Sequence, residues 1–313
     1  PEVLKSINLS VADWSAGKAE IVAFQRQAIA FSLPAKKTSV PEPGSARPPA
    51  VAGQFYPGNI AEIESSLDTL FAEFSDTKPQ SARAVMLPHA GWIFCGAFIA
   101  ETLSRLTVPE VVVVIGPKHT RHGANWSVSA SSEWTLPNAT IPVATEWADF
   151  LAERCPGLEK ETAAHQSEHG CEVLLPFLHR KNPQARVVPI AIGAADYETL
   201  DPLVEALAAL KAELGDRVLF VISSDMNHFA DDEENRRRDA LALEPFTAAD
   251  PRDLFEVCQQ NDISMCGLRP AVAILRALEK ETPATVELVR YDTSARVSGD
   301  TSRVVGYAGA VLR

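Results

Sequence analysis

The sequence has 313 residues, with 29 basic and 41 acidic side chains and a formal net charge of -12. Such a chain is long enough to bury a large core, and its acidic balance argues against a nucleic-acid-binding protein, which needs a basic face. It contains no apolar run of about 18 residues and no basic-then-apolar signal at its start, so we expect no membrane association and a cytoplasmic location. The five scattered cysteines, without a CxxC pair, are expected to be free thiols.

The first 47 residues differ in character from the rest of the chain. Apolar spacing predicts an amphipathic helix over residues 16–31, and Pro34, Pro41 and Pro43 then indicate a linker that runs on into Pro48 and Pro49. We therefore divide the chain into an N-terminal extension with linker, residues 1–47, and an α/β domain, residues 48–313. The predicted helix could pack on this domain, bind a partner or belong to a larger N-terminal region, and the pattern favours none of these.

Predicted strands and helices alternate beyond residue 48. Apolar and β-branched runs predict strands at 84–87, 111–115, 126–130, 187–192, 218–223, 286–291 and 304–311, and helical periodicity predicts helices at 59–74, 97–106, 200–214 and 270–281. The runs VVVVIG and VLFVIS are apolar at consecutive positions, as in strands covered on both faces. We expect an α/β fold with a central, mostly parallel mixed sheet flanked by helices, and an antiparallel hairpin or an excursion from the sheet within 126–143.

Three of the seven histidines follow predicted buried strands. His89 comes after 84–87, His119 after 111–115 and His228 after 218–223, where Asp225 precedes it. Ligands of open α/β sheets bind beyond the carboxyl ends of the strands, and imidazole is the commonest metal ligand and a side chain that titrates near neutrality. A single histidine is more often structural, but three together favour a metal site, an acid/base site or both.

The segment HQSEHGCEVLLPFLHR places further polar residues at the start of a predicted buried helix. His169 and Glu172 are three residues apart and could both face the pocket. A carboxylate that caps the helix beside a hydrogen-bonded structural histidine accounts for them equally well. Both interpretations remain open from the sequence.

Six motifs in order resemble the Memo family, which includes protein B of the AmmeMemoRadiSam system. They are AVAGQFYP, LPHAGWIFCG, VIGPKHT, SEHGCEVLLPFL, ISSDMNHF and ISMCGLRP, and they extend over roughly residues 48–313. The resemblance implies a fold similar to the catalytic subunit of class III extradiol dioxygenases, and a pocket with two histidines and one cysteine as metal ligands. Carried over by motif, these ligands are His89, His119 and Cys266, and Asp225 and His228 are pocket residues with candidate catalytic roles.

The implied thiolate ligand changes the expected chemistry. Extradiol dioxygenases hold ferrous iron with two histidines and a carboxylate, whereas a softer thiolate suits iron, copper or zinc. A carboxylate ligand, from Asp225 or Glu168, stays an alternative. His228 is the candidate acid/base, with Asp225 fixing its tautomer and raising its basicity.

Two classes of function follow from the resemblance. The first is a non-haem metal-dependent oxidoreductase that acts on a small oxygenated or aromatic substrate, with Trp92 and Phe94 as candidate pocket walls. The second is a non-enzymatic metal-binding or peptide-binding module. A third expectation is a modification pathway in which the protein has radical S-adenosylmethionine and AMMECR-like protein partners.

Overall fold

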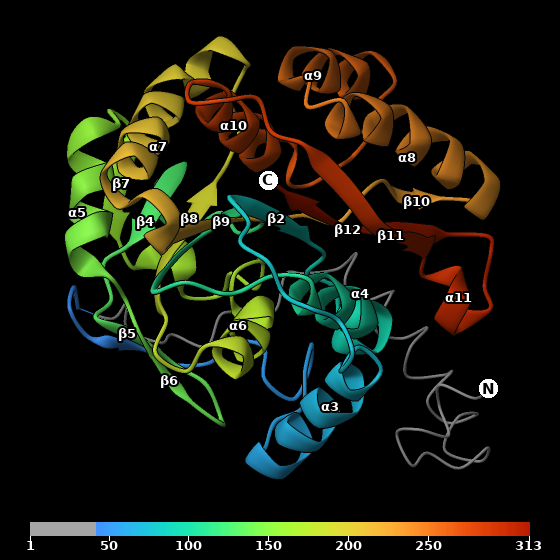
Figure 1. Cartoon of the computed structure of the whole chain (residues 1–313), viewed down its shortest axis with the longest axis horizontal. Coiled ribbons are helices and arrows are strands. Elements are labelled where there is room, and N and C mark those ends of the chain that lie inside the picture. The colour runs from blue at the N-terminus through green and yellow to red at the C-terminus, as the bar shows by residue number, and fades with distance from the viewer. Residues whose placement is uncertain (1–41) are drawn as a thin grey trace.

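The computed structural model describes residues 42–313 (Figure 1). The helix predicted over residues 16–31, with Pro34 and Pro41, lies outside the described residues. In the described part of the chain, no helix combines the length and the apolar character that a bilayer crossing requires.

A nine-stranded mixed sheet forms the centre of the described molecule. The order is β10-β12-β2-β9-β3-β8-β4-β7, and β11 also pairs with β12. These strands are β2 (Ala84–Leu87), β3 (Val111–Pro117), β4 (Trp126–Ser129), β7 (Leu158–Glu161), β8 (Arg186–Ile192), β9 (Val218–Ser223), β10 (His228–Ala230), β11 (Val286–Thr293) and β12 (Val304–Leu312). Strands β2, β9, β3 and β8 run parallel, and β12 and β4 flank them antiparallel. The predicted mostly parallel mixed sheet is confirmed.

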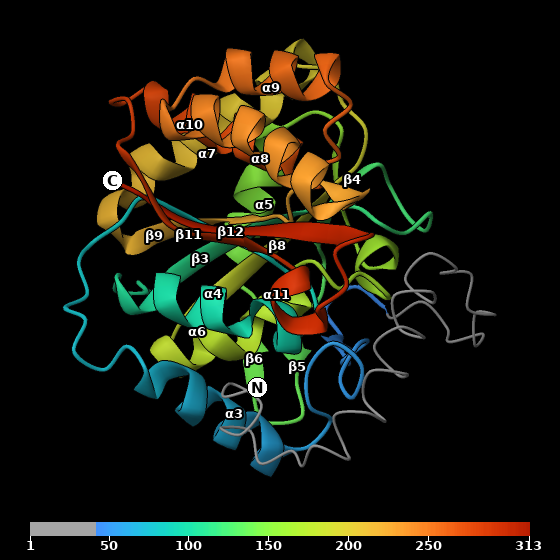
Figure 2. The same cartoon turned by 90° about the vertical axis from the view of Figure 1, so that its right-hand side faces the viewer.

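Helices cover both faces of this sheet, as Figure 2 shows. One face carries α5 (Thr145–Arg154), α7 (Asp201–Leu214), α8 (Asp232–Thr247), α9 (Pro251–Gln260) and α10 (Leu268–Glu279), and the other carries α3 (Ile60–Ala72), α4 (Trp92–Ser104) and α6 (Leu175–Lys181). The short α11 (Ala295–Ser298) connects β11 to β12. Every residue of β3 and β9 is buried, because apolar side chains alternate between the two helical layers.

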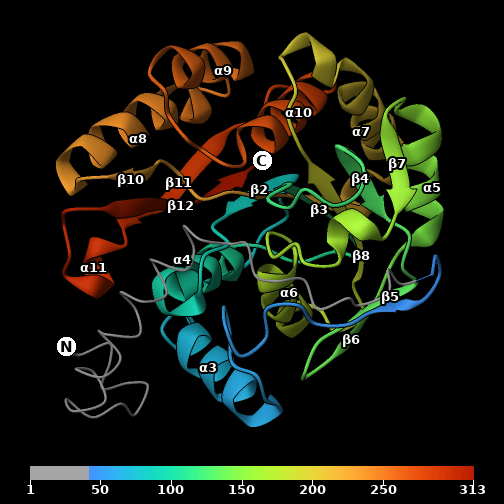
Figure 3. The same cartoon turned by 180° about the vertical axis from the view of Figure 1, so that it is seen from behind.

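A small second sheet lies on the same side of the main sheet as α6 (Figure 3). Strands β5 (Glu133–Thr135) and β6 (Thr140–Pro142) form the antiparallel hairpin expected within 126–143. Strand β1 (Ala46–Arg47) adds parallel to β5, so the end of the stretch assigned to the linker is part of a sheet. The Arg47 side chain is buried there.

Helix α4 begins at Trp92, earlier than the predicted start at residue 97. Its buried residues face both the sheet and α3 and α6, so the apolar positions do not show a clear period of 3.6 residues. The early start leaves only Pro88 to Gly91 between β2 and the helix. His89 is thereby held in a short turn directly at the strand end.

Candidate metal site

The carboxyl ends of three parallel strands bring the predicted site residues together. Strand β9 lies between β2 and β3, so the loops after these strands leave from one edge of the sheet. His89 follows β2, His119 follows β3 and Asp225 follows β9. This is the edge at which open α/β sheets bind ligands.

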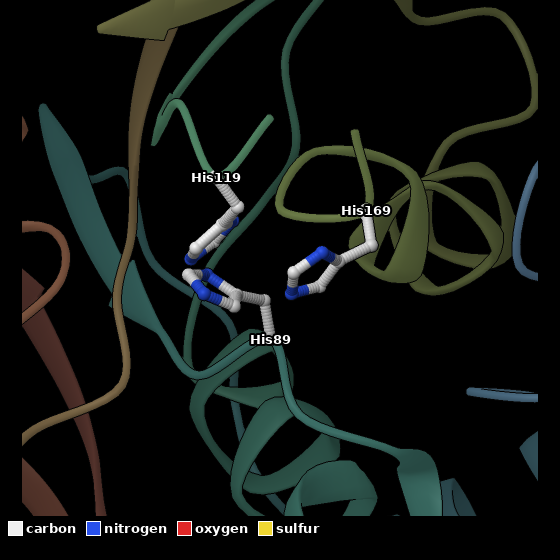
Figure 4. Close-up of side chains that lie close together, drawn as sticks. All are labelled: His89, His119 and His169. Atoms are coloured by element: carbon white, nitrogen blue, oxygen red, sulfur yellow. The ribbon is translucent and has the colours of Figure 1, made fainter. Parts of the chain in front are cut away.

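A third histidine, His169, completes a cluster of imidazoles at this edge (Figure 4). The atoms of His89, His119 and His169 that could hold a metal ion all lie within 4.8 Å of one another. Their ring centroids are 5.2 Å apart for His89 and His119, 5.3 Å for His89 and His169, and 4.4 Å for His119 and His169. His89 is buried and His169 half-buried, whereas 32% of the His119 side chain is exposed. The cluster therefore opens to solvent at His119.

Hydrogen bonds fix which nitrogen of two rings is free. The Ser223 hydroxyl donates to the carbonyl of Gly170, so its oxygen accepts from Nδ1 of His89, at 2.7 Å. Nδ1 of His119 donates to the Glu168 carboxylate, also at 2.7 Å. In both histidines Nε2 is left as the nitrogen that can bind a metal ion.

The surroundings give the three imidazoles different charges. Burial lowers the pKa of His89 and His169 well below the ordinary value, and the charge of His119 lowers both further. Desolvation also lowers the pKa of His119, but Glu168 and Cys266 outweigh it and raise that pKa to about 10. Two rings are thus neutral at pH 7 with lone pairs available, and His119 must release its proton when a metal ion binds.

Glu168 orients this cluster. Its Oε1 accepts from Nδ1 of His119 and from the backbone N–H of Gly170, at 3.0 Å, and lies 3.5 Å from Nδ1 of His169. Its Oε2 accepts from the backbone N–H of His119, at 2.6 Å. Burial opposes the charge of Glu168, but His119 outweighs it and holds the pKa of the carboxyl well below its usual range. A carboxylate behind metal-binding histidines is typical of metal sites, so Glu168 is placed to position ligands rather than to be one.

A buried ion pair fastens the loop that carries Glu168 and His169. The Arg47 guanidinium pairs with Glu172 and donates to the carbonyls of His165, at 2.9 Å, and Glu168, at 2.8 Å. Glu172 also accepts from the Tyr56 hydroxyl, at 2.8 Å. Glu172 therefore binds Arg47 and Tyr56 instead of lining the imidazole cluster.

Cys266 lies beside the histidines, in the loop between α9 and α10. Its Sγ is 3.4 Å from Nε2 of His89 and accepts from the backbone N–H of Asp225 at 3.2 Å. A Cβ atom on Gly267 would lie 2.6 Å from the carbonyl oxygen of Ser223, so only glycine lets the loop approach β9 this closely. Burial raises the pKa of the Cys266 thiol, and His119 counteracts this.

Asp225 and His228 support the site through different contacts from those expected. Oδ1 of Asp225 accepts from the backbone N–H of His89, at 2.8 Å, and so holds the turn after β2. Nδ1 of His228 donates to the carbonyl of Ser264, at 2.9 Å. The tautomer of His228 is therefore fixed by Ser264 and not by Asp225. Burial lowers the pKa of His228 and Asp225 raises it, with the lowering dominant.

A comparison with models of protein families identifies the family of this chain. The model described as Memo-like protein matches residues 47–311. The chain belongs to the Memo-like family. The resemblance predicted from the six motifs is thus confirmed.

Archaeal and bacterial Memo relatives match the chain over their whole length. It is 33% identical over 279 residues to a MEMO1 family protein of Methanopyrus kandleri, 34% over 268 to one of Archaeoglobus fulgidus and 34% over 280 to one of Thermotoga maritima. Each alignment covers 85% of this chain and 99% of the relative. Among solved structures, an uncharacterized protein of Escherichia coli K12 aligns with 74% of this chain and 100% of its own, with a TM-score of 0.48 and 15% identity.

Two residues of this Memo-like site were not selected by their position after a strand. His169 lies in a loop, and its spacing from Glu172 made it a pocket candidate only as one of two open interpretations. Phe55, in the motif GQFYP, packs on the His169 ring with centroids 4.6 Å apart.

Trp92, an expected pocket wall, packs instead on Phe177 with ring centroids 4.6 Å apart. Phe94 is half-buried against Tyr307.

Proposed function

We propose that this Memo-like protein binds one transition-metal ion and is a non-haem metal-dependent oxidoreductase. The donors are the imidazoles of His89, His119 and His169 together with the thiolate of Cys266. The observation that carries the proposal is the convergence of three imidazoles whose ligand-capable atoms lie within 4.8 Å of one another.

The donor set supports a redox-active metal. Imidazole suits zinc, copper and iron, and thiolate adds a soft ligand that favours copper(I), zinc or iron. When bound, such a metal supplies a Lewis acid and, for iron or copper, a centre that exchanges electrons with an oxygen-bearing substrate. The opening at His119 gives a substrate access to the cluster.

His228 is the proposed acid/base of the reaction. Its Nδ1 is held by the Ser264 carbonyl, which leaves Nε2 free to accept a proton. Its lowered pKa keeps the ring neutral at pH 7, the form that a general base requires. Asp225, buried beside it, holds the His89 turn in place while this proton moves.

Metal content and the cobalt spectrum test whether the Cys266 thiolate is a ligand in addition to the three imidazoles. Protein purified without chelator is compared with its Cys266→Ser and Cys95→Ser variants by elemental analysis and by the absorption spectrum after loading with cobalt. The proposal predicts about one metal ion per chain and a thiolate-to-cobalt band that only Cys266→Ser removes. Because Cys95 is buried and its thiol sits against the Ala90 carbonyl, it is a matched control. An unchanged band in Cys266→Ser would show that Cys266 is not a metal ligand and only packs beside the histidines.

Oxygen consumption tests the oxidoreductase. The protein is loaded anaerobically with ferrous iron, or with copper, and oxygen uptake is followed against a panel of catechols. We expect uptake that His228→Gln slows at least about tenfold, the usual contribution of a general base being larger. The absence of uptake by every loaded form would refute the enzymatic part of the proposal and leave metal binding.

A further inference from the structure

We propose that the site takes a planar organic anion as substrate, and that Phe229 and Arg303 recognise it beside His228. The inference rests on the proposed function, because it names the substrate class of the same site. It stands on the shape of β10 and on the surroundings of Arg303.

A bulge in β10 turns Phe229 toward His228. Strand β10 pairs antiparallel with β12, with His228 opposite Val305 and Ala230 opposite Val304, and the register shifts between them. In a regular strand, adjacent side chains point to opposite faces of the sheet. Here the rings of His228 and Phe229 are in contact, with centroids 5.5 Å apart. The bulge therefore places both rings on one side.

Phe229 has a backbone conformation and an exposed ring that do not favour folding. Its φ is 69°, in the left-handed region that bulky residues rarely adopt, and its side chain is among the exposed large apolar groups, at 40%. Strained residues of this kind occur where binding or catalysis requires them, and bulges beside active sites re-aim side chains. An aromatic face is thus offered to solvent next to the proposed acid/base.

Arg303 adds an uncompensated positive charge to this face. Its guanidinium carbon lies 4.5 Å from the centroid of the Phe229 ring. Within residues 42–313 the exposed Arg303 forms no hydrogen bond and no ion pair, although the chain carries a net charge of -12. The arginines of the nearby helix α8 differ, because Arg236, Arg237 and Arg238 each bind a carboxylate.

A guanidinium that is stacked on a ring keeps its in-plane N–H donors free. These donors match the two oxygens of a carboxylate or phosphate, and the adjacent aromatic face matches a planar ring. An aromatic carboxylate or aryl phosphate satisfies both at once beside the His228 ring. The face formed by Phe229 and Arg303 therefore selects planar anions over neutral analogues.

The test compares benzoate with benzamide, which has the same ring without the charge. Dissociation constants are measured by titration calorimetry on the full chain, both metal-free and loaded with cobalt. We expect benzoate to bind more tightly than benzamide, and Arg303→Gln to weaken benzoate about tenfold while leaving benzamide unchanged. Arg154→Gln is the matched control, because Arg154 also stacks on a phenylalanine, Phe150, at 3.7 Å. Equal affinities for the two probes, or equal benzoate affinity in Arg303→Gln, would overturn the inference.

A second variant separates recognition from stability. Phe229→Gly relieves the positive φ and removes the ring, so we expect an unchanged or higher Tm together with weaker benzoate binding. A lower Tm with unchanged benzoate affinity would show that the ring only packs, and would overturn the inference. Metal content is measured on the same samples. If the protein binds no metal but its benzoate affinity still depends on Arg303, the proposed function is contradicted and this inference is not. If it binds one metal ion but its benzoate affinity does not depend on Arg303, this inference is contradicted and the proposed function is not.

Discussion

Glu168 acts on two of the three imidazoles, although the sequence offers it only as an alternative metal ligand. Its carboxylate accepts from the side chain and the backbone of His119 and lies close to His169. Carboxylates in this position raise the basicity of metal-binding histidines and hold their rings in place. Its negative charge also favours the cation that His119 binds once the ring has released its proton.

Replacing Glu168 by glutamine therefore weakens metal binding more than it weakens the fold. The amide keeps the shape of the side chain but loses the charge, and we expect the zinc dissociation constant to rise by about 10- to 100-fold. Competition titration with a chromophoric chelator measures this. Glu101→Gln, which removes one carboxylate of a surface ion-pair group, is the control and should leave zinc affinity unchanged. Equal zinc affinity in Glu168→Gln would contradict the positioning role.

The residues of the site differ in how far the sequence predicts them. His89 and His119 follow buried apolar runs, and the shared sheet edge makes their meeting predictable. Cys266 follows no strand, and its approach depends on Gly267 passing close to the backbone of β9, a tertiary contact without a local signal. His169 is placed by Arg47, which is distant in sequence, so the spacing of histidine and glutamate alone left its role open.

At the scale of elements, the segment that contains β1 holds the His169 loop in place. Arg47 is buried between Glu172 and the ring of Trp134, whose centroid is 4.1 Å away. Removing one partner of a buried ion pair leaves the other charge uncompensated. The resulting loss of stability is larger than the net stabilisation that the intact pair provides.

We expect Arg47→Met to lower the free energy of unfolding by about 3 kcal/mol or more, and Tyr56→Phe by about 1 kcal/mol. The smaller loss follows because Tyr56→Phe removes a single hydrogen bond to Glu172. Urea unfolding measures both. Arg252→Met, which breaks an exposed pair with Glu198, is the control and should leave the free energy of unfolding nearly unchanged. Similar losses in Arg47→Met and in the control would show that the buried pair contributes no more than a surface pair.

His165, in the same loop, makes stability depend on pH. The ring is fully buried, its Nε2 contacts the Ser127 hydroxyl at 3.0 Å, and its Nδ1 has no partner among the described residues. Burial, and then the charge of Arg47, lower its pKa to about 4, against an ordinary value of 6.5. The unfolded chain thus binds a proton at higher pH than the folded chain does.

The contribution of the neutral, buried His165 to the free energy of unfolding is fully present above pH 6.5 and is lost as the pH falls toward 4. The loss amounts to roughly 3 kcal/mol when both states are protonated. Urea unfolding between pH 7 and pH 4 should show a flatter pH dependence for His165→Gln than for the parent. His122→Gln, at an exposed position, should follow the parent. Parallel curves for His165→Gln and the parent would exclude His165 as the source.

For the whole molecule, the sequence predicts the architecture better than the connections. Runs that are apolar on consecutive residues identify β3 and β9 as central strands, since only a sheet covered on both faces buries them. The insertion of β9 between β2 and β3 depends on how the helices pack, which the local pattern does not contain. The pairing of β1 with β5 is of the same kind, because a two-residue strand beside prolines has no periodicity.

The most direct test of the metal centre is a cobalt titration of the parent protein and of its His89→Gln, His169→Gln and His122→Gln variants, followed by visible absorption. The central claim predicts one cobalt ion per chain in the parent, and affinity reduced at least about 100-fold in His89→Gln and His169→Gln, since each loses a nitrogen donor. The exposed His122→Gln should match the parent. Cobalt affinity that is the same in all four proteins, or absent from the parent, would contradict the assignment of this cluster as a metal site.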